Sequence, residues 1–120
     1  MRRVLAVVAI LCLGLSSVAE AATLFAGPLS FPSGGSVRCF AVNVSSRETS
    51  ITLTLLNAAG TQADQLACPT VLAGHSCFLD LSSSSANYCR IEVSAAKNSI
   101  RAVLEMSNSS GAVIATAQAE

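Results

Sequence analysis

The feature that most constrains the fold is an alternation of apolar and polar side chains, which recurs in short segments along the chain. Successive side chains of a β-strand point to opposite faces, so this alternation predicts strands with one buried face. After the first 21 residues, no window sustains the helical period of about 3.6 residues. The alternation is clearest in Ser50–Asn57, Ser76–Leu81, Tyr88–Ser94 and Ser99–Met106.

Three further segments are predicted as strands. Thr23–Ala26 and Ala112–Ala119 are weaker, whereas Val37–Val44 has β-forming residues on both faces and predicts a strand covered on both sides. Seven or eight short strands predict an all-β fold, an antiparallel β-sandwich, with a small closed barrel as the alternative. The predicted turns are Pro28–Gly35, Ser45–Thr49, Ala58–Gly60, Pro69–Gly74, Ser82–Asn87, Ala95–Asn98 and Ser107–Gly111.

The N-terminus has the three-part pattern of a secretory signal peptide. Met1–Arg3 is basic, Val4–Leu15 is apolar, and Ala19–Ala21 fits the small-residue cleavage pattern. The apolar stretch is shorter than the roughly 20 residues that a membrane helix needs. Cys12 does not indicate a lipoprotein, because Leu11 stands where a small residue is required. We therefore expect a signal peptide at 1–21, one domain at 22–120, no membrane span after cleavage, and a periplasmic or secreted protein.

Four cysteines remain after the predicted cleavage, and an even number in an exported chain predicts two disulfides. Three pairings are open to four cysteines. Pro69 and Gly74 lie between Cys68 and Cys77, so a turn there favours the Cys68–Cys77 pair and leaves Cys39 with Cys89. The cysteines are spaced too far apart for a typical zinc site.

The pattern loosely resembles small exported bacterial domains of the immunoglobulin or fibronectin type. The segment from Leu79 through Cys89 resembles the approach to the second cysteine of that fold, in which the two cysteines lie on facing strands of opposite sheets. Tyr88 directly precedes Cys89 instead of lying two residues before it, and the chain has no Trp. The resemblance implies a sandwich architecture and assigns no functional residue.

Motif spacing gives no catalytic, cofactor-binding or metal-binding residues. His75 is the only histidine and is predicted to be a polar loop residue. Ser33–Ser36 is rich in glycine but lacks a P-loop lysine, so it is predicted to be a flexible turn. Four acidic residues show no spacing that indicates acid–base chemistry: Asp64, Asp80, Glu92 and Glu105. We expect a protein that is not an enzyme and has no cofactor.

Charge and aromatic content argue against nucleic acid as a partner. The formal net charge is zero, and removal of Arg2, Arg3 and Glu20 with the signal peptide lowers it to −1. No basic stripe is available to neutralise phosphates, and aromatic residues make up only 4% of the chain, too few for a base-stacking surface.

Two classes of function fit these observations. The first is an exported non-catalytic binding or structural module whose partner is a protein, a cell surface or a carbohydrate. The second is a subunit of a pilus-like or adhesin-like assembly that uses strand exchange, because the terminal strands are weak. Ala112–Ala119 has no charge and no proline, and we expect it to form a hairpin with Ser99–Met106. Either Val113 with Ala115 or Ile114 with Thr116 would then face the core.

The first prediction concerns export. We expect cleavage after Ala21, within about two residues, because the small-residue pattern ends there. Mass spectrometry of the exported protein measures the new N-terminus. Recovery of the chain with Met1 intact in an aqueous extract would contradict the prediction.

Overall fold

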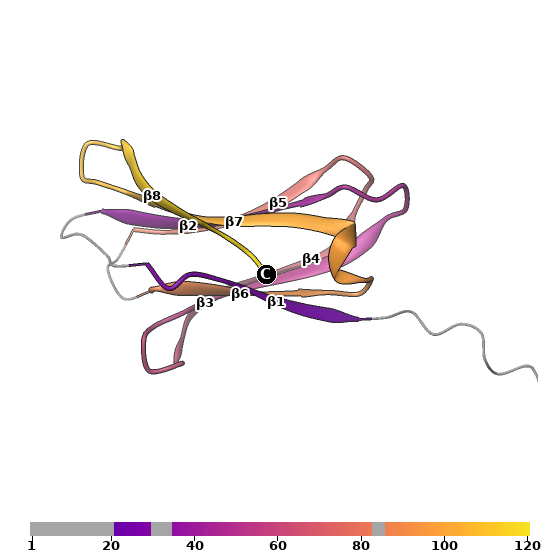
Figure 1. Ribbon diagram of the computed structural model, residues 1–120, viewed down its shortest axis with the longest axis horizontal. Helices are drawn as coiled ribbons and strands as arrows, with labels where there is room; N and C mark the ends of the chain where they lie inside the picture. The colour runs from indigo at the N-terminus through magenta and orange to yellow at the C-terminus, as the bar shows by residue number, and fades with distance from the viewer. Residues whose placement is uncertain (1–20, 30–34, 83–85) are drawn as a thin grey trace, which may run out of the picture.

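The chain folds into two antiparallel β-sheets packed face to face (Figure 1). The computed structural model describes residues 21–29, 35–82 and 86–120. Nearly all of the predicted signal peptide, Ser33 and Gly34 of the glycine-rich turn, and 83–85 of the serine run lie outside the described residues. The elements are β1 (Ala22–Ala26), β2 (Ser36–Asn43), β3 (Thr49–Leu56), β4 (Gln62–Val71), β5 (Ser76–Leu81), β6 (Tyr88–Val93), the 3-10 turn η2 (Lys97–Ser99), β7 (Ile100–Ser107) and β8 (Val113–Gln118).

The strand order is β1-β6-β3-β4 in one sheet and β5-β2-β7-β8 in the other. This arrangement confirms the predicted all-β fold with eight antiparallel strands in two sheets. The pairings β2–β5 and β3–β6 are those of an immunoglobulin sandwich. The terminal strands are placed differently, because β1 lies beside β6 and β7 lies beside β2. The immunoglobulin type therefore stays a prediction.

The core lies between the sheets and consists of the inward-facing residues of the alternating segments. Leu53, Ile91 and Leu104 are fully buried, and Leu79 on β5 is nearly so. Each comes from a segment whose alternation predicted a buried face, so period-2 spacing placed these side chains correctly.

Two disulfides join the sheets, and both have the predicted partners. Cys39 on β2 bonds to Cys89 on β6 in the middle of the core, with 6.1 Å between their Cα atoms. Cys68 on β4 bonds to Cys77 on β5, where the chain passes from one sheet to the other. The turn between these cysteines runs from Leu72 to His75 and has Gly74 at a φ of 79°.

β4 was not predicted as a strand. Its residues are mostly exposed, so the sequence has no alternation there, and Pro69 was assigned to a turn. In the structure Pro69 lies within β4, which stands at the end of the strand order and pairs with β3 alone among the described strands. Proline is tolerated on such an edge strand because the missing N–H leaves no central ladder bond unmade.

β8 pairs with β7 in the predicted hairpin, with Met106 opposite Ala115 and Leu104 opposite Ala117. Ala115 packs against the core, so Ile114 with Thr116 is not the inward pair. The expected pairing of Val113 with Ala115 on the core face is only half right: the register shift places Val113 opposite outward-facing Ser107, and it is 53% exposed. A register shift between Met106 and Ser107 accompanies the turn.

Beyond Gln118 the chain crosses from one sheet toward the other (Figure 1). The backbone N–H of Glu120 donates to the carbonyl of Phe25 at 3.0 Å, and the N–H of Phe25 donates back at 3.1 Å. These bonds connect β1 to the end of the β8 segment and join the two layers along this side.

The second prediction compares the two disulfides. Cross-links that close longer loops remove more entropy from the unfolded chain: about 4 kcal/mol for a 50-residue separation and about 2–3 kcal/mol for a separation of 9. We expect the double variant Cys39→Ala/Cys89→Ala to lose more unfolding free energy than Cys68→Ala/Cys77→Ala. Urea denaturation of both variants measures this. A larger loss from the Cys68–Cys77 pair would contradict the expectation.

Candidate interaction surface

The outer face of the β5-β2-β7-β8 sheet carries a row of apolar side chains. Phe40 on β2 lies opposite Phe78 on β5 and opposite Val103 on β7, so these residues form one line across three strands. Phe78 is 49% exposed, while Phe40 and Val103 are half-buried. Val42 lies two residues further along β2 and is also half-buried.

This apolar row corrects one sequence expectation. The two-sided pattern of Val37–Val44 predicted a strand covered on both faces. In the structure Val37, Cys39 and Ala41 face the core, whereas Phe40 and Val42 belong to an outer sheet face that no layer of the described residues covers. The apolar residues on this second face are therefore not explained by packing within the described part of the chain.

A charged row lies beside the apolar one. The Arg38 guanidinium donates two hydrogen bonds to the Asp80 carboxylate, at 2.6 Å and 3.2 Å, and its Cζ lies 5.0 Å from the centroid of the Phe78 ring. The hydrogen bond with Asp80, the charge of Asp80 and, more weakly, the charge of Glu105 raise the pKa of Arg38. Because both partners are 48% exposed, this pair contributes little to stability. Its geometry holds a cation against the exposed aromatic ring.

A groove of about 450 Å³ continues from the apolar row toward the end of β8. Its apolar wall includes Phe40, Val42 and Val103. Two cations, Lys97 and Arg101, and one carboxylate, Glu120, lie among its polar residues. Arg101 donates to the carbonyl of Ile100 at 3.0 Å. In the described ranges the ion pairs are those of Arg38 and Arg90, so neither groove cation takes part in one.

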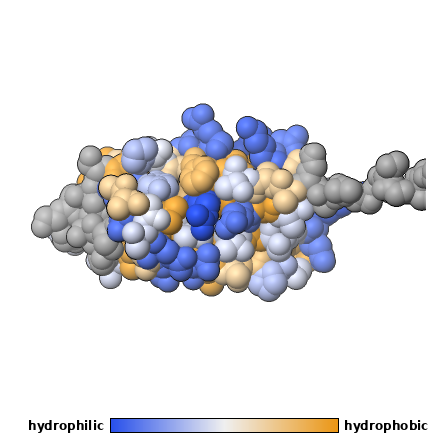
Figure 2. All heavy atoms as spheres, turned by 90° about the horizontal axis from the view of Figure 1, so that it is seen from below, coloured by the Kyte–Doolittle hydropathy of each residue, from blue (hydrophilic) through white to orange (hydrophobic). Residues whose placement is uncertain are grey.

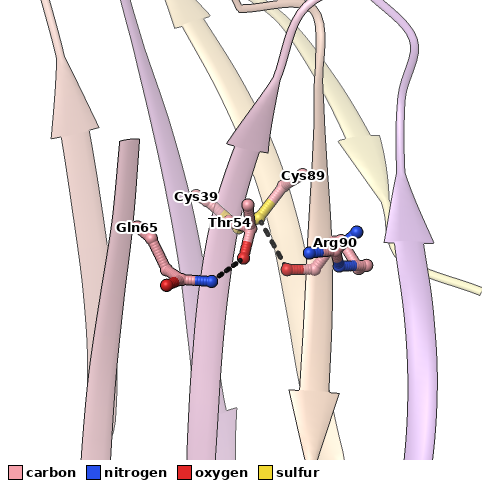
Figure 3. The surroundings of a disulfide bond; sticks show 5 residues. All are labelled: Cys39, Thr54, Gln65, Cys89 and Arg90. Carbon is pink, nitrogen blue, oxygen red and sulfur yellow. Dashed lines mark hydrogen bonds between the residues drawn. A yellow bond between two sulfur atoms is a disulfide. The ribbon is translucent and has the colours of Figure 1, made fainter. Parts of the chain in front are cut away.

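The outer face of the other sheet is different. In Figure 2, which views the molecule from below, hydrophilic residues are interspersed with hydrophobic ones across the visible surface. Thr54 on β3 faces outward, yet it is fully buried between the side chains of its neighbours Arg90 and Gln65. Figure 3 shows the Gln65 amide donating to the Thr54 hydroxyl, at 2.9 Å. This face covers its buried polar group with its own side chains.

The side chain of Arg90 also covers Thr54 on this outer face. Its Nε lies 3.5 Å from Glu92 Oε1, close enough for an ion pair, but this buried Nε has no hydrogen-bond partner among the described residues. The carbonyl of Arg90 approaches Cys89 Sγ at 3.7 Å (Figure 3). The disulfide sulfur carries no hydrogen, so this is a contact and not a donated bond.

The residues weighed for chemistry do not come together. His75 is exposed in the β4–β5 turn. Asp80 pairs with Arg38 and Glu92 with Arg90, on opposite sheets. Within 21–29, 35–82 and 86–120, no three His, Cys, Asp or Glu residues are placed to hold a metal ion. The same ranges contain no helix long and apolar enough to cross a membrane.

Asn43 shows how a buried polar side chain serves the fold. It is fully buried at the end of β2, and its amide nitrogen donates to the carbonyls of Arg47 and Val71, at 2.7 Å and 2.9 Å. Its Oδ1 accepts from the backbone and the hydroxyl of Ser45. These bonds connect β2, the β2–β3 loop and β4, so we assign Asn43 a structural role.

Comparisons with family models, with curated proteins and with solved structures gave no match to this chain. The candidate surface consequently stands on its geometry alone. Sequence reasoning did not single out Phe40, Phe78 or Arg38. The sequence signal for this surface is the two-sided apolar pattern of Val37–Val44, which by itself predicts a strand buried on both faces.

The third prediction contrasts Asn43 and His75, which are joined by a backbone hydrogen bond. The N–H of Asn43 donates to the carbonyl of His75, but only Asn43 is buried. We expect His75→Ala to change the unfolding free energy by less than about 0.5 kcal/mol. Asn43→Ala should cost about 1–3 kcal/mol, because it leaves the Val71 carbonyl without its partner. Thermal and urea unfolding measure both, and a larger loss from His75→Ala would contradict the assignment.

Proposed function

We propose that this chain is an exported, non-catalytic β-sandwich protein that acts as a binding module at the cell envelope or outside the cell. The apolar row of Phe78, Phe40 and Val103 on an outer sheet face is the observation that carries the proposal. Large apolar residues grouped on a surface mark interaction sites more often than single exposed ones do. The two disulfides support an oxidising compartment.

The partner that fits this face is a protein surface with an apolar centre and an acidic edge. The apolar row and the groove wall supply contact area for the centre. Lys97 and Arg101 outnumber Glu120 among the charged groove residues, which favours a carboxylate on the partner. Arg38 and its aromatic neighbour Phe78 add a cation stacked on a ring, an arrangement common in binding surfaces.

Strand exchange, the function of a pilus-like subunit, has less support. A strand donor needs a partner whose sheet lacks a strand. Here β8 already fills the place beside β7, with Ala115 packed against the core. Donation of β8 would require breaking this pairing.

The fourth prediction tests the binding face in the source organism. A photo-crosslinking residue at Phe78 should yield an adduct with a partner, whereas one at Thr23, exposed on β1 of the other sheet, should not. The charge reversals Lys97→Glu and Arg101→Glu together should reduce the adduct from position 78, because the acidic edge of the partner is then repelled.

Western blotting of the exported fraction measures the adduct, and the unfolding temperature of each variant serves as the control for folding. Equal adducts at positions 78 and 23, or none at 78, would contradict the proposal. An adduct that the charge reversals leave unchanged would remove the acidic edge from the description of the partner.

A further inference from the structure

The β8 strand presents an edge without the usual protection against pairing. The stretch from Ala112 to Ala119 has no charged residue and no proline. Val113 and Ile114 are 53% and 50% exposed. Of the other sheet edges, β4 carries Asp64 and Pro69, and β5 carries Asp80.

The edge of β1 is already in use, because Phe25 pairs with Glu120. Among the described strands, β8 therefore combines a free edge with an uncharged sequence.

The backbone bonds show which residues of β8 face this free edge. The N–H of Ala119 donates to the carbonyl of Ala102, so Ala119 directs its backbone groups toward β7. Glu120 directs its groups the opposite way, toward Phe25 on β1. Backbone groups alternate in direction along a strand. It follows that Ala115 and Ala117 bond to β7, while Thr116 and Gln118 direct their N–H and C=O groups outward. Ile114 is the extra residue at the register shift, so the alternation is not extended to it.

We propose that β8 pairs with β8 of a second copy of this chain, antiparallel, about a two-fold axis. Two antiparallel copies of one edge satisfy each other's outward groups, which is the self-complementarity that a two-fold interface requires. The two β5-β2-β7-β8 sheets then form one continuous sheet. No like charges meet, because the strand has none.

We place the two-fold axis at Thr116. The outward groups of Thr116 in the two chains then bond to each other, and Gln118 of each chain lies opposite Ile114 of the other. Thr–Thr is among the favourable cross-strand pairs. A register centred on Gln118 would bring Thr116 of the second copy opposite Glu120, where β1 is already bonded. A register centred on Ile114 would place the Ser110 turn opposite Gln118 and leave fewer bonds.

This inference uses the strand edge of β8, which shares Gln118 with the groove. Phe78 lies on β5, at the opposite edge of the same sheet, so it separates the two proposals. Substitution of Phe78 should leave the self-association unchanged, so failure of one proposal does not entail failure of the other.

The direct test is hydrogen exchange of the exported protein at increasing concentration, followed residue by residue by NMR. In the single chain the amide of Ala117 is bonded to β7 and exchanges slowly, while the amide of Thr116 is free to exchange. Between about 1 μM and 1 mM, the range of weak association, protection of the Thr116 and Gln118 amides should rise as dimer forms. Sedimentation equilibrium reports the dimer itself.

Two variants give the same test by mutation. Thr116→Pro removes an outward N–H without touching the bonds to β7, and Thr116→Lys places like charges opposite each other across the axis. The lysine has Glu105 as its cross-strand neighbour within the single chain, so the fold should tolerate it. Thr70→Lys, on the exposed edge strand β4, is the matched control.

We expect both Thr116 variants to keep a near-normal unfolding temperature and to dimerise at least about tenfold more weakly than the unmodified protein. Thr70→Lys should dimerise normally. The proposal is overturned if the unmodified protein stays monomeric at about 1 mM. It is equally overturned if a dimer forms whose strength neither Thr116 variant changes, or whose formation leaves the Thr116 amide unprotected.

Discussion

The bond between Cys39 and Cys89 is the constraint around which the two sheets are arranged. It joins β2 to β6 in the middle of the core, and each of these strands has a neighbour on both sides. The strands next to the bridge carry the large buried side chains, including Leu53 and Leu104, so the bridge and the packed residues fix the same face-to-face contact. A chain of this size has a small core, and a cross-link limits the freedom of its unfolded state.

The outer faces of the two sheets differ in which side chains they expose to solvent. On the β1-β6-β3-β4 sheet, Arg90 and Gln65 lie over Thr54 and seal it from solvent. On the β5-β2-β7-β8 sheet, Phe40 lies opposite Phe78, which is 49% exposed although Arg38 lies against its ring. The first sheet also exposes one outward aromatic side chain, Phe25. The second face differs because its apolar side chains form a line across three strands, and this line underlies the proposed function.

Sequence patterns predicted the fold well where one strand face is buried. Alternation in the segments of β3, β5, β6 and β7 identified both the strands and their inward residues, because burial acts on every second side chain. The same reasoning missed β4, whose residues are mostly exposed and therefore show no alternation. The pairing of Cys68 with Cys77 was predicted from the turn-forming residues between them, which is a local property.

The candidate surface could not be predicted in the same way. It depends on which strands become neighbours, and the line from Phe78 through Phe40 to Val103 joins segments that are far apart in the sequence. A two-sided apolar pattern also has the same appearance whether the second face is covered by the protein itself or left for a partner. The two cases are distinguished only by the structure, in which β2 lies in a sheet whose outer face is not covered by a further layer of the described residues.

The strand order has a consequence for how fast the chain can fold. Among the described strands, only β3–β4 and β7–β8 are pairings between strands consecutive in the sequence. β1 pairs with the distant β6, and β2 pairs with the distant β5 and β7. Folds dominated by such distant pairings form slowly, because loop closure costs entropy before the contacts compensate for it. Neither sheet can be completed until most of the chain is present. Under the proposed export, slow folding gives the chain time to cross the membrane before its sheets close, and the disulfides then form on the oxidising side.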